Sequence, residues 1–467
     1  MKAELNYEQL AKIYAGKLLL RSEIDLHDQT LHTLLQSSTF STLPSILQKR
    51  FSNQCQRCGN HDIKYFGLID CLLCGHIHLY CRKCISMGRV SACQPLYLWT
   101  GDTPAWPIIA EPCTWKGELT EAQQVAANRV KQAILQKEKD LLVWAVTGAG
   151  KTEMLFPGIA EAIAKGQRVC IATPRADVVR ELYPRIKSAF QMTEIQALYG
   201  GSEERDGIGQ LIIATTHQLL RFKHAFDVIV LDEMDAFPYT NDPSLPFVTS
   251  RALKTNSTMI YLTATPKASD QIKISRQKLP HVFVPNRYHG QALPIPQSIP
   301  CFSLKKDIQA NQVPKALLKW IKHRNNPHRQ LLLFVPTIQI ADQWQKFLPE
   351  LFLQHQLIQD KSELTTVHAS DHDRKTKVEL FREKKLKILV TTTILERGVT
   401  FPSVDVVVVD AGHDVFDEAA LVQIAGRAGR SALDPTGEVL FMHTGKTEAI
   451  IRSIQMIKQM NKRAGLK

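Results

Sequence analysis

Short apolar runs alternate with amphipathic, helix-like stretches over most of this chain. In the first part of that pattern, runs typical of buried β-strands occupy residues 141–146, 168–173, 211–215, 227–232 and 259–264. A second series of such runs occupies residues 331–336, 387–392, 404–410 and 438–443. Strands separated by helices form parallel sheets with helices on both faces. The pattern therefore predicts two tandem α/β domains.

Shifts in composition predict where the domains begin and end. A Pro-rich stretch divides the two series of strands, and a Pro- and Trp-rich stretch precedes the first series. In chain order we expect a helical N-terminal segment over 1–54, a cysteine-rich module over 55–95, a linker over 96–116, the first α/β domain over 117–284, a joint over 285–300 and the second α/β domain over 301–467. We expect the cysteine module to fold as a unit separate from the α/β domains.

The overall composition narrows the class of protein. Hydrophobic residues make up 44% and charged residues 22% of the 467 positions, which is typical of a globular chain rather than a disordered one. The 58 Lys and Arg residues exceed the 45 Asp and Glu residues, and the resulting net charge of +13 favours a polyanionic partner. Residues 1–20 lack the apolar core of a secretory signal, and no run reaches the roughly 18 apolar residues of a membrane span. We therefore expect a soluble, cytoplasmic protein.

The segment AVTGAGKTE, residues 145–153, follows a predicted strand and opens a predicted helix. This is the context of a phosphate-binding loop, whose backbone N–H groups hold the phosphates of ATP. Lys151 would reach the β- and γ-phosphates, and the Thr152 hydroxyl would bind Mg²⁺. Ala145 stands where the usual pattern has its first glycine. The candidate nucleotide-binding residues in this loop are Thr147, Gly148, Ala149, Gly150, Lys151 and Thr152.

Two adjacent acids at the end of the strand over 227–232 complete the predicted ATPase site. Asp232 and Glu233 follow a run of apolar residues in the sequence LDEMDAF. Asp232 would hold Mg²⁺ through its water shell, and Glu233 would polarise the water that attacks the γ-phosphate. An exposed acidic turn does not usually follow such an apolar run. The two motifs together predict an ATPase.

From about residue 117 to residue 445 the chain resembles the superfamily-two, DEAD-box-like helicases, whose two α/β domains are RecA-like. In the segment ELTEAQQ, Gln123 resembles the residue that reads adenine. Thr263, Ala264 and Thr265 resemble the segment that links hydrolysis to strand movement. The residues that resemble the family's contacts to the nucleic-acid backbone are Thr173, Pro174, Arg175, Gly201, Thr215, Thr216 and Thr392. Contacts to the backbone do not distinguish one base from another, so we expect nucleic-acid binding without sequence specificity.

The segment QIAGRAGR, residues 423–430, resembles the arginine-finger motif of these helicases. We expect Arg427 and Arg430, three residues apart, to lie on one face of a helix. Their guanidinium groups would neutralise charge that develops on the γ-phosphate. Gln423 and Arg397 would sense the same nucleotide.

Six of the ten cysteines form three CxxC pairs within residues 55–84. Two such pairs complete a tetrahedral zinc site, whereas a redox role is the alternative. The spacing leaves the choice of pairs open between Cys55, Cys58, Cys71 and Cys74 and a set in which Cys81 and Cys84 replace the second pair. In the latter case His76 and His78 could contribute to a second ion. We interpret the remaining cysteines, Cys93, Cys113, Cys170 and Cys301, as structural.

Several segments are similar to those of the ComFA family of competence ATPases: CQRCG, YCRKCISMGRV, LDEMDAFPY and QIAGRAGRS. The resemblance implies a zinc site of Cys55, Cys58, Cys81 and Cys84. It also implies a motor that acts on single-stranded DNA at the inner face of the cell membrane, with an uptake channel and a ComFC-like, phosphoribosyltransferase-like protein as partners. One alternative is a replication-restart helicase of the PriA type, in which the cysteines interrupt the second motor domain. Another is a nucleic-acid-binding scaffold with weak ATPase activity.

Overall fold

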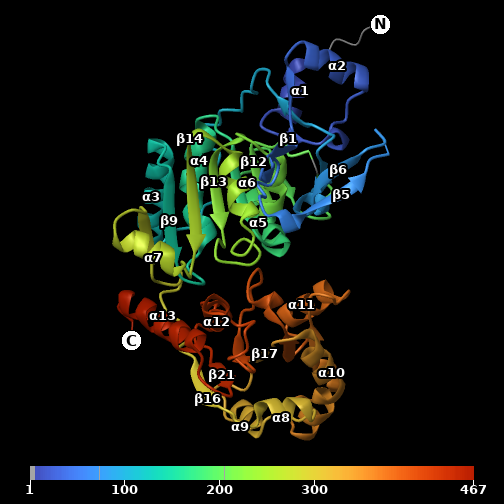
Figure 1. Ribbon diagram of the computed structural model, residues 1–467. Coiled ribbons are helices and arrows are strands. Elements are labelled where there is room, and N and C mark those ends of the chain that lie inside the picture. The colour runs from blue at the N-terminus through green and yellow to red at the C-terminus, as the bar shows by residue number, and fades with distance from the viewer. Residues whose placement is uncertain (1–5, 73, 205, 467) are drawn as a thin grey trace. The chain divides into compact units, whose positions relative to one another are not determined.

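The computed structural model describes residues 6–72, 74–204 and 206–466. The chain divides into two compact units (Figure 1). The first comprises residues 1–143 and 152–282, and the second comprises residues 144–151 and 283–467. Among the described residues, no helix combines the length and the apolar character needed to cross a bilayer.

The first large sheet has seven strands in the order β11-β12-β10-β13-β14-β9-β15. Its strands are β9 (Asp140–Ala145), β10 (Val169–Thr173), β11 (Ile195–Leu198), β12 (Leu211–Thr215), β13 (Phe226–Asp232), β14 (Leu253–Thr263) and β15 (His281–Val284). The pairs β11–β12, β12–β10, β10–β13 and β13–β14 are parallel. The associated helices are α3 (Glu121–Gln136), α4 (Lys151–Ala164), α5 (Ala176–Ala189), α6 (Ser244–Ala252) and α7 (Ala268–Ser275). Strands buried on both faces are apolar almost throughout, which is why the sequence revealed most of them.

The second large sheet has six strands in the order β16-β21-β20-β17-β19-β18, and all its neighbours pair in parallel. Its strands are β16 (Gln297–Pro300), β17 (Gln330–Phe334), β18 (Leu364–Val367), β19 (Ile388–Thr391), β20 (Val404–Val408) and β21 (Val439–His443). Its helices are α8 (Leu304–Gln309), α9 (Lys315–Lys322), α10 (Ile338–Gln354), α11 (Arg374–Arg382), α12 (Glu418–Ala425) and α13 (Glu448–Arg463). The predicted pair of parallel-sheet domains is thus confirmed. The joint expected over 285–300 contributes a strand of its own, β16, at the sheet edge.

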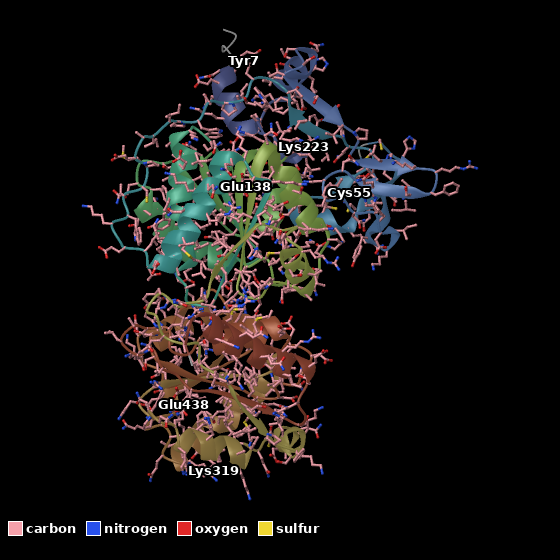
Figure 2. All side chains as sticks on the ribbon, turned by 90° about the vertical axis from the view of Figure 1, so that its left-hand side faces the viewer. Tyr7, Cys55, Glu138, Lys223, Lys319 and Glu438 are labelled. Carbon is pink, nitrogen blue, oxygen red and sulfur yellow. The ribbon has the colours of Figure 1, made fainter. Side chains whose placement is uncertain are left out.

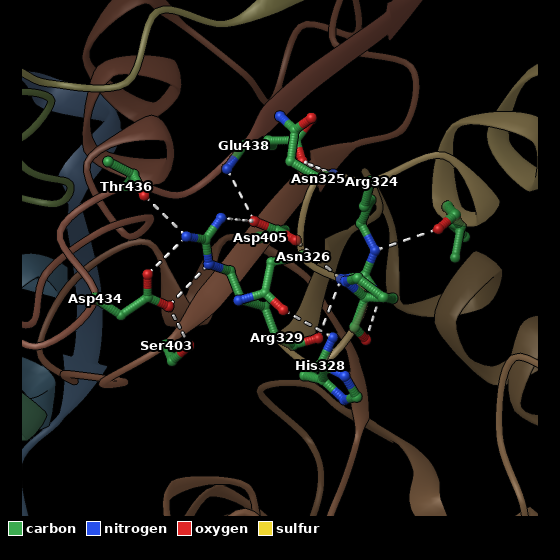
Figure 3. A network of polar contacts seen from close by, with 12 residues as sticks. Arg324, Asn325, Asn326, His328, Arg329, Ser403, Asp405, Asp434, Thr436 and Glu438 are labelled. Atoms are coloured by element: carbon green, nitrogen blue, oxygen red, sulfur yellow. Dashed lines mark hydrogen bonds and ion pairs between the residues drawn. The ribbon is translucent and has the colours of Figure 1, made fainter.

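A buried ion-pair network joins the amino ends of β17, β20 and β21 in the second unit (Figure 3). Asp405, which is 0% exposed, pairs with Arg324 at 3.0 Å and with Arg329 at 3.5 Å. Arg329 also pairs with Asp434 at 2.6 Å, and this contact raises the pKa of the Arg329 guanidinium and lowers that of the Asp434 carboxyl. Asp434 lies four residues after Arg430. The network therefore fixes the segment that follows the candidate arginine fingers.

The N-terminal segment is not purely helical, in contrast to the expectation for residues 1–54. Helices α1 (Tyr7–Tyr14) and α2 (Asp28–Gln36) accompany a three-stranded sheet in the order β1-β8-β2. Its strands are β1 (Leu18–Leu19), β2 (Phe40–Leu43) and β8 (Leu96–Trp99). The central strand comes from the stretch expected to be a linker, because Trp99 packs edge-on against Phe40, which in turn packs against Tyr14. Burying these rings outweighs the turn-forming composition around residues 100–107.

The cysteine module is also part of the first unit rather than a separate one. It contains β3 (Ile46–Lys49), β4 (Ser52–Cys55), β5 (Phe66–Asp70), β6 (Ile77–Cys81), β7 (Val90–Ser91) and the 3₁₀-helix η3 (Arg82–Met87). One continuous apolar core includes residues of this module and of the seven-stranded sheet, among them Cys55, Cys58, Phe66, Cys81, Cys84, Leu219, Phe222, Leu245 and Val248. The expectation of a separate module is wrong, because a segment of this size buries too little apolar surface by itself.

Candidate functional site: phosphate loop, acidic strand end and cysteine cluster

The phosphate loop joins the carboxyl end of β9 to the amino end of α4. Gly148 and Gly150 have φ angles of +80° and +71°, which residues with a Cβ atom rarely adopt. The Ala149 amide donates to the Val146 carbonyl at 3.2 Å, closing the turn. Thr147 is 3% exposed, and within the described part of the chain its Oγ1 atom has no hydrogen-bond partner. A buried hydroxyl without a partner at this position suits a loop whose missing partner is a bound nucleotide.

The acids Asp232 and Glu233 stand at the carboxyl end of β13, as the sequence indicated. The Asp232 carboxylate accepts a hydrogen bond from the Glu233 amide at 2.9 Å. Glu233 has a φ of +56°, an uncommon conformation for a residue with a Cβ atom. Its Oε2 atom is buried and, considering residues 6–72, 74–204 and 206–466, lacks a hydrogen-bond partner. Strained backbone and an unsatisfied carboxylate oxygen at one residue are features of catalytic positions.

Asp235, the last acid of the DEMD segment, connects β13 to the end of β14. Its carboxylate accepts hydrogen bonds from Thr263 Oγ1 at 2.7 Å and from Thr265 Oγ1 at 2.5 Å. All three side chains are at most 9% exposed. The segment at 263–265, which resembles the link between hydrolysis and strand movement, is therefore bound directly to the acidic motif.

Six of the seven candidate contacts to nucleic acid lie along three adjacent strands of the same sheet, whereas Thr392 directly follows β19 of the second sheet. Thr173 ends β10 and pairs in register with Thr215, which ends β12. On the other side of β12, Leu198 of β11 pairs with Ala214 and directly precedes the Tyr199–Gly201 turn. Arg175 is half-buried and precedes α5. Because carboxyl ends of parallel strands share one edge, this edge carries the candidate strand-binding motifs at β10, β11 and β12 and the candidate hydrolytic motifs at β9, β13 and β14.

Gln123 is buried, and it has a structural role in addition to the adenine-reading role that the resemblance implies. Its Oε1 atom accepts from the Thr120 amide at 2.8 Å, and Thr120 Oγ1 accepts from the Gln123 amide at 3.4 Å. These reciprocal bonds form a capping box that starts α3. The motif that resembles an adenine-reading segment thus also fixes where its own helix begins.

The arginines of QIAGRAGR do not lie on a helix, which corrects the sequence-based expectation. Helix α12 ends at Ala425, and the chain continues through tight turns to Gly429, whose φ is +61°. Arg427 is 2% exposed and donates to the Glu396 carbonyl at 2.9 Å. Arg430 is half-buried and donates to the Gly426 carbonyl at 3.1 Å. Gln423 and Arg397 are 5% and 2% exposed, so the whole motif is packed against the turn at 392–400.

Arg287 is a functional candidate that the sequence analysis missed. It is 1% exposed and donates to the carbonyls of Ala428 and Gly429, both at 2.6 Å. The next residue, Tyr288, donates its amide to the Gly148 carbonyl at 3.0 Å, and all these residues belong to the second unit. Burial lowers the pKa of Arg287 to about 9. No local signal marks this arginine, because its partners are more than a hundred residues away.

Four cysteine sulfurs from the first and third pairs meet in the first unit, where Cys55 is labelled in Figure 2. Cys55, Cys58, Cys81 and Cys84 are all at most 1% exposed, and their ligand atoms lie within 4.8 Å of one another. The Cys55–Cys84 and Cys58–Cys81 sulfur distances are 3.7 and 3.6 Å. A tetrahedral zinc ion with bonds of about 2.3 Å would separate its sulfurs by about 3.8 Å. The cluster therefore fits zinc, and the 71/74 pair lies outside it.

Arg251 of α6 forms hydrogen bonds both to this cluster and to the candidate strand-binding edge. Arg251 donates to the carbonyls of Gln56 and Arg57 in the first CxxC turn, and also to the Leu220 carbonyl at 2.8 Å. Leu220 belongs to the 3₁₀-helix η4 (Thr216–Arg221), which directly follows Thr215. Burial is the main reason why the pKa of Arg251 falls to about 10. The cysteine cluster thus supports the element that carries Thr216.

The fold and the site define the class of protein. Residues 116–268 match the family description "Type III restriction enzyme, res subunit", and residues 312–432 match "Helicase conserved C-terminal domain". A solved structure of the Mycobacterium smegmatis helicase Lhr bound to ssDNA and AMP-PNP is similar, with a TM-score of 0.52 and 17% identity over 73% of this chain and 48% of that one. Dbp5 of S. cerevisiae bound to RNA and ADP BeF3 gives a TM-score of 0.50 and 18% identity, covering 74% and 88%. These likenesses show the RecA-like fold, and with the family matches they indicate a superfamily-two, helicase-like ATPase.

Full-length relatives identify the family. Residues 4–98 match "Competence protein ComFA N-terminal domain". The chain is 43% identical over 458 residues to the competence protein ComFA of Bacillus subtilis (strain 168), covering 98% of this chain and 96% of that protein. It is 37% identical over 454 residues to ComFA of Streptococcus pneumoniae, covering 97% and 99%. The chain belongs to the ComFA family, as its motifs indicated, and it is an ATP-dependent, helicase-like competence motor.

Proposed function

We propose that this protein uses ATP hydrolysis to move along single-stranded DNA during DNA uptake. The observation that carries the proposal is the division of one sheet edge into two adjacent halves. The carboxyl ends of β9, β13 and β14 carry the motifs that we assign to hydrolysis, and those of β10, β11 and β12 carry the motifs that we assign to strand binding. Movement of the β13 acids on hydrolysis would reach the strand-binding half through the directly paired β10.

In the proposed mechanism each motif has a separate task. The loop amides around Gly148 and the Lys151 ammonium would bind the phosphates of ATP, and Thr152 and Asp232 would hold the accompanying magnesium ion. Glu233 accepts a proton from the attacking water. Arg427 and Arg430 act as arginine fingers that stabilise charge on the γ-phosphate, so that turnover depends on the second sheet domain. Asp235 passes the change in the acidic motif to Thr263 and Thr265.

A DNA-stimulated ATPase assay tests this proposal. Single-stranded DNA of any sequence should raise the hydrolysis rate, and DNA binding should weaken with salt. For about six neutralised phosphates the log–log slope of affinity against salt is about −4. If neither single-stranded nor duplex DNA changes the rate and no salt-sensitive binding occurs, the protein is a scaffold with weak ATPase activity instead.

Arg175 is the contact to test first, because it is half-buried at the amino end of α5, next to the end of β10. Arg175→Ala should reduce stimulation by DNA and leave hydrolysis without DNA nearly unchanged. Arg276→Ala is the matched control, since Arg276 is an exposed arginine at the end of α7 in the same unit. If DNA stimulates ATP hydrolysis equally in both variants, Arg175 is not one of the DNA contacts.

We also propose that Cys55, Cys58, Cys81 and Cys84 bind one structural zinc ion. The support for this is the burial of all four sulfurs and their spacing. Cys55→Ser and Cys84→Ser should each lose this ion and lower the stability of the first unit, because the cluster shares the core of that unit. ATPase activity should fall with it. Metal analysis that finds this zinc retained in a Cys55/Cys84 double variant would contradict the assignment.

The partners follow from membership of a competence family. We propose single-stranded DNA, the membrane uptake channel and a ComFC-like, phosphoribosyltransferase-like protein as partners, and a location at the inner face of the cell membrane. Copurification of the tagged, full-length chain with the ComFC-like protein of the same organism tests the protein partner. A complex that resists high salt but is absent from a control with an unrelated helicase would support it, and failure to copurify at micromolar concentration would oppose it.

A further inference from the structure

The turn at Cys71–Gly75 repeats the geometry of the first CxxC turn. In the first turn the Gly59 amide donates to the Cys55 carbonyl at 2.8 Å, and the Cys55 amide donates to the Asn60 carbonyl at 3.0 Å. In the second turn the Gly75 amide donates to the Cys71 carbonyl at 2.8 Å, and the Cys71 amide donates to the His76 carbonyl at 3.0 Å. Gly59 and Gly75 have φ angles of +73° and +72°. The described residues Cys71, Gly75 and His76 thus make the same backbone hydrogen bonds as their counterparts in the first CxxC turn.

Two side chains from other parts of the fold meet this turn. Cys93 follows β7 and lies with its sulfur 3.6 Å from that of Cys71. His78 of β6 has its Nε2 atom 3.0 Å from the Cys74 sulfur. The three sulfurs of Cys71, Cys74 and Cys93 all lie within 4.8 Å of one another. Three thiols therefore converge at the end of the β5–β6 hairpin, and the His78 imidazole contacts one of them, that of Cys74.

The types of donor and the spacing of the three sulfurs match a structural zinc site. The Cys71–Cys93 distance equals the Cys58–Cys81 distance of 3.6 Å in the buried cluster. Sulfur and imidazole donors favour Zn²⁺ over Mg²⁺ or Ca²⁺, which prefer oxygen, and three Cys with one His is a usual structural zinc set.

Burial of apolar side chains contributes little near the tip of the hairpin, as two of its described residues show. Leu68 of β5 is 71% exposed and Ile77 of β6 is 64% exposed, so the apolar side chains here are not buried in a core. The third strand, β7, pairs with β6 only at Tyr80 and Cys81, far from the tip, so near Asp70 and Ile77 the sheet has two strands. Two-stranded ribbons are marginally stable in water without further support. A metal ion that joins the tip to Cys93 would tie both strands to the segment after β7.

We propose that Cys71, Cys74, Cys93 and His78 bind a second zinc ion that clamps the tip of the β5–β6 hairpin. The site differs from the buried four-cysteine cluster in its ligands and in its exposure. Cys74 is exposed, and Cys71 and Cys93 are half-buried. This second ion would therefore exchange with chelators faster than the buried one.

The test measures zinc in the full-length protein, purified with a thiol reductant and dialysed against zinc-free buffer. We expect about two zinc ions per chain in the unchanged protein and about one in Cys93→Ser. His78→Ala should lose one ion to a mild chelator, whereas His76→Ala, which changes the other histidine of the hairpin, should keep both. Cys113→Ser is the control for a thiol outside both clusters and should also keep both ions.

Two further measurements separate the proposal from simpler explanations. Addition of Co²⁺ to the metal-free protein should give tetrahedral thiolate–cobalt absorption that saturates at about two ions per chain, and at about one in Cys93→Ser. Cys93→Ser should also retain its ATPase rate, because the variant keeps the buried cluster. The proposal is overturned if the unchanged protein saturates at about one ion, or if intact-mass measurement without reductant shows a Cys71–Cys93 disulfide in place of the metal.

Discussion

The Glu23 carboxylate joins three parts of the first unit, and replacing it by the equally large Gln tests how tightly they depend on one another. Glu23 lies in the 3₁₀-helix η1 (Arg21–Glu23) and accepts from Arg57 at 2.7 and 2.8 Å. Its Oε1 atom also lies 3.3 Å from Nε of Arg221 in η4. Arg57 stands between Cys55 and Cys58. One carboxylate therefore connects the N-terminal segment, the cysteine cluster and the candidate strand-binding edge.

The size of the stability loss expected for Glu23→Gln follows from how deeply the Arg57–Glu23 pair is buried. The Arg57 side chain is 0% exposed and that of Glu23 is 18% exposed, so Glu23→Gln leaves a buried guanidinium without its carboxylate. Removing one partner of a buried pair costs about 3–5 kcal/mol, and the partial exposure of Glu23 favours the lower end, about 3 kcal/mol. At about 2–4 °C per kcal/mol for a unit of this size, the melting transition of the first unit should fall by about 6–12 °C.

Glu8→Gln is the matched control. Glu8 pairs with Lys12 at 3.9 Å, and their side chains are 83% and 49% exposed, so the change should cost less than about 0.5 kcal/mol. Calorimetry, with the two units resolved as separate transitions, gives both shifts. The rate of zinc release to a chelator should rise in Glu23→Gln only. If the two variants melt within about 1 °C of each other, the buried pair does not hold these parts together and the reasoning fails.

Three further predictions concern catalysis, pH and the segment that carries the candidate arginine fingers. Glu233→Gln should bind ATP normally but hydrolyse it at least about 100-fold more slowly, and near-normal turnover in a single-turnover assay would contradict its role as the base. Burial lowers the pKa of Lys17 to about 7, below its ordinary value of 10.5, so between these values the unfolded chain binds a proton that the folded chain does not. The stability of the first unit should therefore rise with pH from about 7 towards 10, and Lys17→Met should flatten that rise in chemical denaturation; an equal rise in both proteins would exclude Lys17 as its source. Arg287→Lys should lower turnover and destabilise the second unit by about 2–3 kcal/mol, because one ammonium cannot reproduce the forked contacts to Ala428 and Gly429; unchanged unfolding and turnover would show that those contacts are dispensable.

Two of the sequence-based expectations were corrected for related reasons. The arginines of QIAGRAGR were expected on a helix face, but α12 stops at Ala425, and the carbonyls beyond it bond to the distant Arg287. Residues 96–99 were expected in a linker, but they form the central strand of a sheet because Leu96 and Trp99 fill the space beside β1 and β2. In both cases contacts from elsewhere in the chain overrode a local pattern.

The sequence by itself determined the two parallel sheets, the phosphate loop and the acidic strand end. These features are local, since an apolar run makes a buried strand wherever the sheet lies, and the candidate phosphate-binding residues follow one strand in an unbroken segment. It also determined the family, because nine-tenths or more of the chain aligns with ComFA relatives.

Only the tertiary structure decided which residues act together across the chain. Spacing alone permitted two pairings of the CxxC turns, and the fold brought Cys55 and Cys58 to Cys81 and Cys84 while it brought Cys93 to Cys71. It also merged the cysteine module with the core of the first sheet. The physical reason is that sulfur–sulfur contacts, buried ion pairs and shared apolar cores depend on distances in space. Residues tens to hundreds of positions apart acquire these distances only when the chain has folded.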